Sequence, residues 1–350
     1  MNDTIKISSA PVGPGHDPFV IAEMSGNHNG SLDRALEIVE AVAETGAHAL
    51  KLQTYTPDTI TIDVDNEHFR VSSGHELWGD RKLYDLYAEA HTPWEWHEPI
   101  FDLARKRGMV AFSAPFDPTA VEFLEGLDVP AYKVASAEIV DLPLVRAMAS
   151  TGKPLIISTG MANMAEIHAA VTAARETGNE QIIVLSCTAS YPAPAEDSNL
   201  RSIPVLRDLL GTQIGLSDHT VGIGAAIAAV ALGATVIEKH VTLNRADGGV
   251  DSAFSLEPDE LGQLVRETAT ARAALGEPVV GPREAEGEVL RLRRSLYVVK
   301  DVKAGERISA ENVRSIRPAG GLAPDLFDTV SGREFRTDAA KGTPLTWDLI

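Results

Sequence analysis

The chain of 350 residues has very little cysteine and no long apolar run. Cys187 is its only cysteine, which excludes intrachain disulfides and any metal centre built from several thiolates. No stretch of about 18 consecutive apolar residues occurs, so the sequence predicts no membrane span. The first residues also lack the apolar core of a signal peptide, and we therefore expect a cytoplasmic protein.

Positive charge is scarce as well. Lys and Arg number 31 against 50 Asp and Glu, a formal net charge of −19. Because a phosphate backbone requires a basic face, this composition argues against nucleic acid as a partner. The deficit is uneven: residues 291–350 carry a net charge of +3, which leaves −22 for residues 1–290. The basic tail either docks on an acidic surface, its own or a partner subunit's, or is solvated surface charge.

Short apolar runs rich in β-branched residues alternate with amphipathic stretches of helical length. This pattern is typical of strand–helix units around a parallel sheet. Gly46 and Gly178 follow two of the helical stretches, where glycine is the expected C-cap. No G-x-G-x-x-G motif follows the first strand. Eight consecutive units favour an α/β fold of the closed (β/α)8 TIM-barrel type over an open doubly wound sheet. The strand candidates are residues 19–23, 49–53, 109–113, 131–136, 154–159, 182–187, 213–217 and 235–240.

Three further regions depart from the repeat. Residues 55–100 are long for one crossover and rich in Trp, Tyr and His, which suits either a packed insertion or a lid or subunit contact over the barrel. We expect the barrel to occupy residues 1–275. Residues 276–290, rich in Pro, Gly and charge, read as a linker. Residues 291–350 form a small second domain with strand-like pieces at 295–302 and 342–347.

Nearly every predicted strand ends in polar or charged residues, and active sites of such barrels gather at the carboxyl ends of the strands. His219 and His240 end the seventh and eighth strands, which are neighbours. A single histidine is more often a satisfied polar residue, but two on adjacent strand ends favour a divalent metal such as Mn, Fe, Co or Zn. Water and substrate oxygens would complete the coordination shell.

Two lysines, Lys51 and Lys133, also end strands. Buried lysines in that position are Schiff-base nucleophiles or clamps for anions. Ser136, Ser158 and Ser217 lie at similar heights, which favours a seat for phosphate and carboxylate groups. A Schiff-base aldolase remains the alternative from the residues alone.

Several motifs in order resemble one family. They are "IAEMSGNHNGS", "LKLQTYTPD", "YKVASAEI", "ISTGMA", "GLSDHT", "VIEKHVTL", "RRSLYVVKDVKAGE" and "RPAGGLAP". The chain is similar over residues 15–350 to the nonulosonic acid synthases, the N-acetylneuraminate synthase family. The resemblance implies a TIM barrel followed by a C-terminal SAF domain, a small antifreeze-like β-clip fold. Within the family, "QTYTPDTIT" and "DGGVDSAFSLEPDE" look most like the branch that makes pseudaminic acid.

The resemblance implies a reaction and roles for individual residues. Phosphoenolpyruvate would condense with 2,4-diacetamido-2,4,6-trideoxy-β-L-altropyranose, an N-acetylated deoxy-sugar, and phosphate would leave. The metal would be Mn²⁺, with Mg²⁺ or Co²⁺ as alternatives. The implied catalytic residues are Glu23, His219, His240 and Asp251, of which the two histidines hold the metal. The implied phosphoenolpyruvate contacts are Lys51, Lys133, Ser136, Ser158 and Ser217. The implied sugar contacts are Gln53, Tyr191, Asp251 and Arg317.

The family resemblance also implies a homodimer in which the SAF domain of one subunit is swapped over the barrel of its partner, so that Arg317 reaches the partner's sugar. Two alternatives stay open. One is the synthesis of N-acetylneuraminic or legionaminic acid by the same chemistry. The other is a non-catalytic glycan-binding protein, which the charged strand ends argue against.

Overall fold

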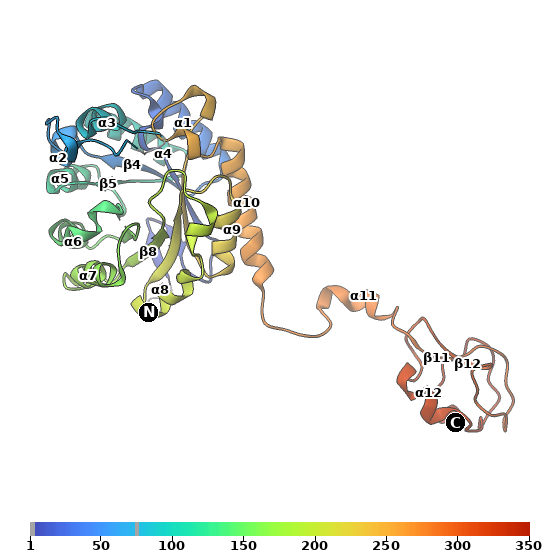
Figure 1. Cartoon of the computed structure of the whole chain (residues 1–350). Coiled ribbons are helices and arrows are strands. Elements are labelled where there is room, and N and C mark those ends of the chain that lie inside the picture. The colour runs from blue at the N-terminus through green and yellow to red at the C-terminus, as the bar shows by residue number, and fades with distance from the viewer. Residues whose placement is uncertain (1–3, 74–76) are drawn as a thin grey trace. The chain divides into compact units, whose positions relative to one another are not determined.

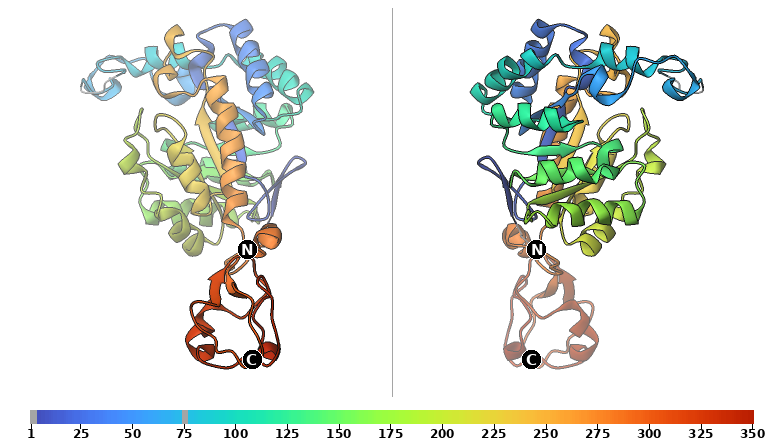
Figure 2. Two further views of the ribbon diagram at one scale, coloured as in Figure 1. Left: turned by 90° about the vertical axis from the view of Figure 1, so that its right-hand side faces the viewer. Right: turned by 90° about the vertical axis from the view of Figure 1, so that its left-hand side faces the viewer.

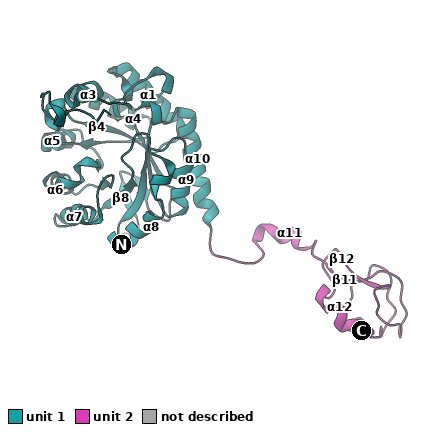
Figure 3. Ribbon diagram, viewed as in Figure 1, with its two compact units in different colours: residues 1–276 teal, residues 277–350 magenta. Residues whose placement is uncertain are grey.

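The computed structural model describes residues 4–73 and 77–350, so His75 and Glu76 of the long region 55–100 lie outside the described part. The chain divides into two compact units, Met1–Gly276 and Glu277–Ile350 (Figure 3). Each unit has a hydrophobic core of its own.

The first unit is a closed parallel barrel in the order β10-β3-β4-β5-β6-β7-β8-β9 (Figure 1). The predicted (β/α)8 fold is therefore confirmed. The barrel closes where the last strand pairs with the first, with His240 in register with Glu23. The strands are β3 (Phe19–Glu23), β4 (Ala49–Thr54), β5 (Val110–Pro115), β6 (Tyr132–Val134), β7 (Leu155–Ser158), β8 (Ile182–Cys187), β9 (Gln213–Asp218) and β10 (Val236–His240).

Each strand is followed by a helix that packs on the outside of the barrel, as the two views of Figure 2 show; after β4 two shorter helices come first. Their apolar stripes bury against the strands, which is why the helical stretches alternate so regularly with apolar runs. These helices are α1 (Leu32–Thr45), α4 (His97–Lys106), α5 (Pro118–Gly126), α6 (Leu142–Ala149), α7 (Met164–Arg175), α8 (Ser202–Leu210), α9 (Gly224–Ala231) and α10 (Pro258–Leu275).

Local signals set the helix ends. Ser31 caps α1 by accepting from the Arg34 backbone N–H, and Gly46 ends the helix at a φ of 80°, a conformation that favours glycine. Helix α7 stops at Arg175, and Gly178 turns the chain two residues after its C-cap at a φ of 87°. Gly46 is thus the C-cap that its position predicts, whereas Gly178 is not: the C-cap of α7 is Glu176, and Gly178 lies in the turn that follows.

The sequence did not reveal the hairpin that precedes the barrel. Strands β1 (Ile5–Ile7) and β2 (Ala10–Val12) pair antiparallel, and the side chains of Ile5, Ile7 and Val12 belong to the barrel core. The region 55–100 adds α2 (Pro57–Ile60) and α3 (Leu83–Ala90) before α4. Among the described residues, no helix is long and apolar enough to cross a bilayer.

The second unit contains two antiparallel strands, β11 (Ser295–Val298) and β12 (Val313–Ile316), and the short helices α11 (Gly287–Leu290) and α12 (Phe327–Val330). Its core is small and includes Leu296, Val298 and Phe335. The strand-like piece at 342–347 is not a strand: it makes a single bridge between Pro344 and Tyr297, and proline has no backbone N–H to extend a ladder.

Candidate active site

Four charged side chains meet inside the barrel, and we call Glu23, Lys51, Lys133 and Glu238 the inner charge cluster. The Lys51 ammonium lies 2.6 Å from Glu23 Oε2 and 3.5 Å from Glu238 Oε2. Lys133 Nζ lies 3.8 Å from Glu238 Oε1. Strands β6 and β10 lie far apart in the barrel order, so this last contact crosses the interior.

Burial and mutual attraction set the protonation of the cluster. Burial raises the pKa of Glu23 against the attraction of Lys51, and burial lowers the pKa of Lys133 despite Glu238. Burial would also raise the pKa of Glu238, but Lys133 and Lys51 outweigh it and hold that pKa below its ordinary value. The cluster therefore disfavours the charge on one acid and one base, a pattern typical of reactive sites.

The histidines His219 and His240 lie above this cluster with ring centroids 5.4 Å apart. They lie at the ends of the adjacent strands β9 and β10, as the sequence predicts. His219 Nδ1 lies 2.9 Å from the Thr188 carbonyl oxygen and donates to it, which makes Nε2 the nitrogen that can accept when the ring is neutral. Burial beside His219 and the lysines lowers the pKa of His240 well below its ordinary value, so this ring is neutral.

These two rings fit a divalent metal with open positions. His240 Nδ1 is buried without a hydrogen bond, and the carbonyl partner of His219 fixes its tautomer in the way that outer partners of metal ligands do. Across residues 4–73 and 77–350 there is no group of three or more His, Cys, Asp or Glu arranged to hold an ion. Any metal here would therefore keep positions for water and substrate, as a catalytic site requires.

Asp251 approaches the same histidines from the loop after β10. Its Oδ2 lies 3.6 Å from His240 Nδ1 and accepts a short hydrogen bond from the Ser25 hydroxyl. Asn27 ties the loops together further, because its amide donates to the Val241 carbonyl at 2.8 Å and to the Ser255 hydroxyl at 2.9 Å. Burial raises the pKa of Asp251.

The three predicted serines differ in their partners. Ser217 donates to Glu238 Oε1 at 2.9 Å. Ser136 lies 3.5 Å from Cys187 Sγ and accepts from the Gly160 N–H at 3.2 Å. The buried Ser158 hydroxyl makes no hydrogen bond within the described chain, which leaves it available to a ligand.

Of the predicted sugar contacts, Tyr191 comes nearest to the histidines. Its ring centroid lies 4.4 Å from that of His219 and 5.3 Å from that of Phe254. Gln53 is half-buried near the end of β4, two residues beyond Lys51. Arg317 lies in the second unit, after β12, with an exposed side chain. The other eleven predicted site residues belong to the first unit.

Three further residues in or beside this region are not among the predicted site residues. Glu238 is the carboxylate that both lysines share. Burial raises the pKa of Glu138 to about 7, and the nearby Lys133 moderates the shift. Trp78, from the region 55–100, lies with its ring centroid 5.7 Å from that of Tyr191. A strand-end position signalled the two glutamates, but nothing in the sequence places Trp78.

A second buried ion pair lies on the outer face of strands β9 and β10. Asp218 and Lys239 are partners in register on β9 and β10, and Lys239 Nζ lies 3.1 Å from Asp218 Oδ2 with both side chains 1% exposed. Lys239 also donates to the Thr220 carbonyl. We call Asp218 and Lys239 the outer ion pair.

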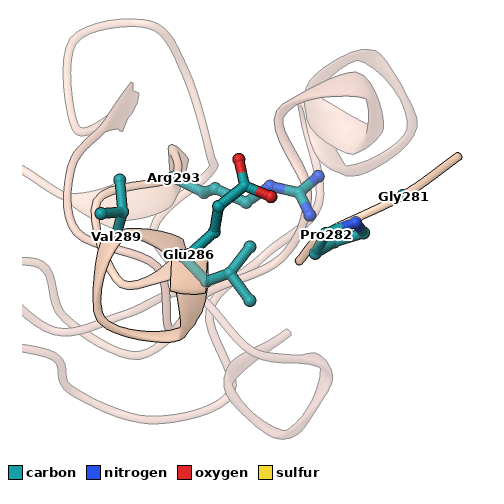
Figure 4. Close-up of a pocket in the computed structure, with 6 residues that line it drawn as sticks. Gly281, Pro282, Glu286, Val289 and Arg293 are labelled. Carbon is teal, nitrogen blue, oxygen red and sulfur yellow. The ribbon is translucent and has the colours of Figure 1, made fainter. Parts of the chain in front are cut away.

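A hollow of about 350 Å³ in the second unit contains none of the predicted site residues. In Figure 4 the side chains of Glu286 and Arg293 face each other across it. Its other walls are Gly281, Pro282, Val289 and Leu290. This hollow lies in the segment around α11 and offers no comparable cluster of buried charged groups.

Comparisons with known proteins agree with the division into a barrel and a small second domain. The NeuB family model matches residues 38–280 and the SAF domain model matches residues 293–350. The chain is 44% identical over 330 residues to a pseudaminic acid synthase of Campylobacter jejuni, covering 93% of this chain and 95% of that one. It is 34% identical to an N,N'-diacetyllegionaminic acid synthase of Legionella pneumophila, covering 97% and 96%. The crystal structure of N-acetylneuraminic acid synthetase from Leptospira borgpetersenii superposes with a TM-score of 0.73 at 31% identity, covering 82% and 95%.

Proposed function

The chain belongs to the NeuB family, and from this membership we propose that it condenses phosphoenolpyruvate with 2,4-diacetamido-2,4,6-trideoxy-β-L-altropyranose and releases phosphate, the reaction of pseudaminic acid synthesis. The higher identity to the Campylobacter synthase than to the legionaminic acid enzyme supports this sugar. Because phosphoenolpyruvate is a cytoplasmic metabolite, we place the reaction in the cytoplasm.

One observation carries the proposal: the inner charge cluster lies beside a pair of histidines, His219 and His240, at the carboxyl end of the barrel. Phosphoenolpyruvate has a carboxylate and a phosphate, and Lys51 and Lys133 are the buried ammonium groups that can hold them. Ser158, with its hydroxyl unbonded, and Ser136 add donors. The pKa of Glu23 is raised. When Glu23 is protonated, it no longer repels a bound anion.

The reaction forms one carbon–carbon bond and breaks one carbon–oxygen bond. Carbon 3 of phosphoenolpyruvate bonds to the aldehyde carbon of the open sugar, and the aldehyde oxygen gains a proton. Water adds at carbon 2 and loses a proton, and the bond from carbon 2 to the phosphate oxygen breaks. Glu138, whose pKa is about 7, is suited to donate or accept a proton at neutral pH. Glu23 would orient the water, and the lysines neutralise the leaving phosphate.

His219 and His240 would hold the divalent metal, Mn²⁺ or alternatively Mg²⁺ or Co²⁺. When bound, the metal supplies Lewis-acid polarisation of the sugar aldehyde. Asp251, 3.6 Å from His240, would orient that ring and contact the sugar. Gln53 and Tyr191 would contact the sugar from β4 and from the loop after β8.

The decisive experiment measures phosphate release from phosphoenolpyruvate with a panel of sugars and Mn²⁺. The altrose derivative should support release at least tenfold better, by kcat/KM, than N-acetylmannosamine or the 2,4-diacetamido-2,4,6-trideoxy-mannose that leads to legionaminic acid. A preference for either of those sugars would contradict the proposed substrate. Full phosphate release by a H219A/H240A protein would contradict the metal assignment, and none by the wild type with any sugar would favour a non-catalytic glycan-binding role.

We also propose a homodimer in which Arg317 of one copy reaches the sugar bound by the other. The basic tail and acidic barrel are complementary in charge, and exposed apolar side chains crowd the connecting segment. These are Leu275, Val279, Val280, Val289, Leu290 and Leu292. Such a series on one short segment needs a covering surface.

Mixing two inactive variants tests this arrangement. In a swapped dimer, R317A and H219A copies assemble heterodimers in which one site has an intact barrel and an intact Arg317. With free exchange, about a quarter of wild-type activity should return. No recovery after confirmed exchange would show that Arg317 does not act across subunits.

A further inference from the structure

Trp78 reaches the site from a segment that is not part of the strand–helix repeat. Strand β4 ends at Thr54 and β5 begins at Val110, and Trp78 lies between them, before α3. Its indole N–H donates to the Val250 carbonyl at 3.0 Å, a contact between residues 172 positions apart. The side chain is partly exposed.

The Trp78 side chain contacts two loops beside the histidine pair: the loop after β10, which carries Val250, and the loop after β8, which carries Tyr191. Val250 directly precedes Asp251, and its side chain packs so closely on Gly26 that a Cβ there would lie 2.5 Å from Val250 Cγ2. On its other side, the Trp78 ring lies 5.7 Å from Tyr191, which in turn lies 4.4 Å from His219. Trp78 therefore contacts both the loop that carries Asp251 and the loop that carries Tyr191.

Trp78, Tyr191 and Phe254 form an aromatic wall beside the histidines. Phe254 is buried, with its ring centroid 5.0 Å from that of His240. The chemistry of this wall is opposite to that of the inner charge cluster, which suits the two anionic groups of phosphoenolpyruvate. The sugar, as the second substrate, would therefore contact the aromatic wall. Aromatic faces favour apolar groups over hydroxyls.

We propose that Trp78 determines sugar specificity by contacting apolar parts of a diacetamido trideoxy sugar, namely the methyl groups of its acetamido substituents and the methyl group at carbon 6. This inference rests on the proposed function and names the residue that selects its substrate. A sugar with hydroxyls at carbons 4 and 6 presents polar groups to the indole ring and loses hydration there without a hydrogen-bonding partner.

The experiment compares W78A, W78L and W78F in the full-length protein with Mn²⁺. W78A and W78L remove the ring, and the KM for the altrose derivative should rise at least tenfold while the KM for phosphoenolpyruvate changes less than twofold. The preference for the altrose derivative over N-acetylmannosamine, as the ratio of kcat/KM values, should fall at least tenfold. W78F keeps a ring without the N–H and should retain most of the preference.

The matched control is W94F, in the same region. Trp94 stacks on Phe123 with centroids 4.7 Å apart and takes no part in the aromatic wall, so the kinetics of W94F should match those of the wild type.

An unchanged sugar preference in folded W78A or W78L overturns the inference. A loss in W78F equal to that in W78A also overturns it, because the N–H contact to Val250 would then be responsible. Should both ring-free variants fail to fold, saturation-transfer NMR on the wild type and W78F decides: no transfer from aromatic protons to the sugar methyl groups overturns it. Failure of the wild type to use the altrose derivative refutes the proposed function instead.

Discussion

The inner charge cluster and the outer ion pair are built differently: the four groups of the cluster come from β3, β4, β6 and β10 and meet inside the barrel, whereas the outer pair joins the neighbouring strands β9 and β10. The outer pair matches one lysine with one carboxylate at 3.1 Å. The inner cluster has two lysines and two carboxylates at distances from 2.6 to 3.8 Å, and burial displaces the pKa values of Glu23 and Lys133 toward the uncharged forms. Burial also lowers the pKa of Lys239 against the attraction of Asp218, so the difference lies in the arrangement. The outer pair joins two neighbouring strands, whereas the inner cluster shares its contacts among four groups around the barrel interior, where we expect the ligand.

The largest expected effect comes from K133M in the inner cluster. Loss of this ammonium removes a contact to the substrate anion and should lower kcat/KM by about a thousandfold or more. The melting temperature should change little, because burial already disfavours the Lys133 charge and Glu238 keeps Lys51 at 3.5 Å. Steady-state kinetics and thermal unfolding monitored by circular dichroism measure both quantities.

The control for K133M is K153M, a lysine paired with Glu125 outside the site, which should leave kcat/KM unchanged. If K133M lost stability as severely as activity, the inner cluster would be structural like the outer pair.

The reverse pattern is expected for D218N in the outer pair. It leaves Lys239 buried without its carboxylate and should lower the free energy of unfolding by about 3–5 kcal/mol, as measured by urea denaturation. The double variant D218L/K239M removes both charges and should recover most of that loss. A change under about 1 kcal/mol in D218N would show that the pair contributes little to holding β9 and β10.

A smaller effect is expected for G160A, which tests how tightly the inner face is packed around Ser136. A Cβ at this glycine would lie 2.7 Å from the Ser136 hydroxyl and 2.9 Å from the Ala189 methyl. Overpacking of this kind should cost about 1–3 kcal/mol of stability, measured by urea denaturation, and S136A should relieve part of it. G224A is the control, since nothing lies within 4 Å of a Cβ there. Equal stabilities of G160A and G224A would contradict the close contact.

The smallest effect concerns pH. Burial raises the pKa of Glu138 from 4.5 to about 7, so the folded state binds this proton more tightly than the unfolded state. The contribution of Glu138 to stability therefore falls as pH rises from about 4.5 to about 7. E138Q lacks this titration and should gain up to about 1 kcal/mol over the wild type between pH 5 and pH 8, allowing for solvent screening. Urea denaturation at both pH values checks it, and a pH-independent difference would contradict the shifted pKa.

The sequence predicts the barrel well because each unit repeats the same local signals: an apolar strand, a polar residue at its end and a capped helix. Knowledge of strand order then brings His219 and His240 to adjacent positions. The hairpin of Ile5–Val12 was not predicted, since its strands of three residues are too short to show alternation.

The contacts that cross the barrel could not be predicted from the sequence. Lys133 meets Glu238 only because strands far apart in the closed order face a shared interior. Trp78 meets Val250 only through the path of an irregular segment, for which no periodic signal exists. Local patterns specify which residues point inward, but the identity of their partners depends on barrel closure.

The pairing of β10 with β3 also bears on how the protein is made. Glu23 and His240 are in register, so neighbouring parts of the site are separated by most of the barrel sequence. During synthesis the lysines and Glu23 emerge long before His219, Glu238 and His240, and long-range pairings of this kind form slowly. We expect ligand binding to begin only after the eighth strand has left the ribosome and closed the seam, so a nascent chain presents no partial active site to free phosphoenolpyruvate.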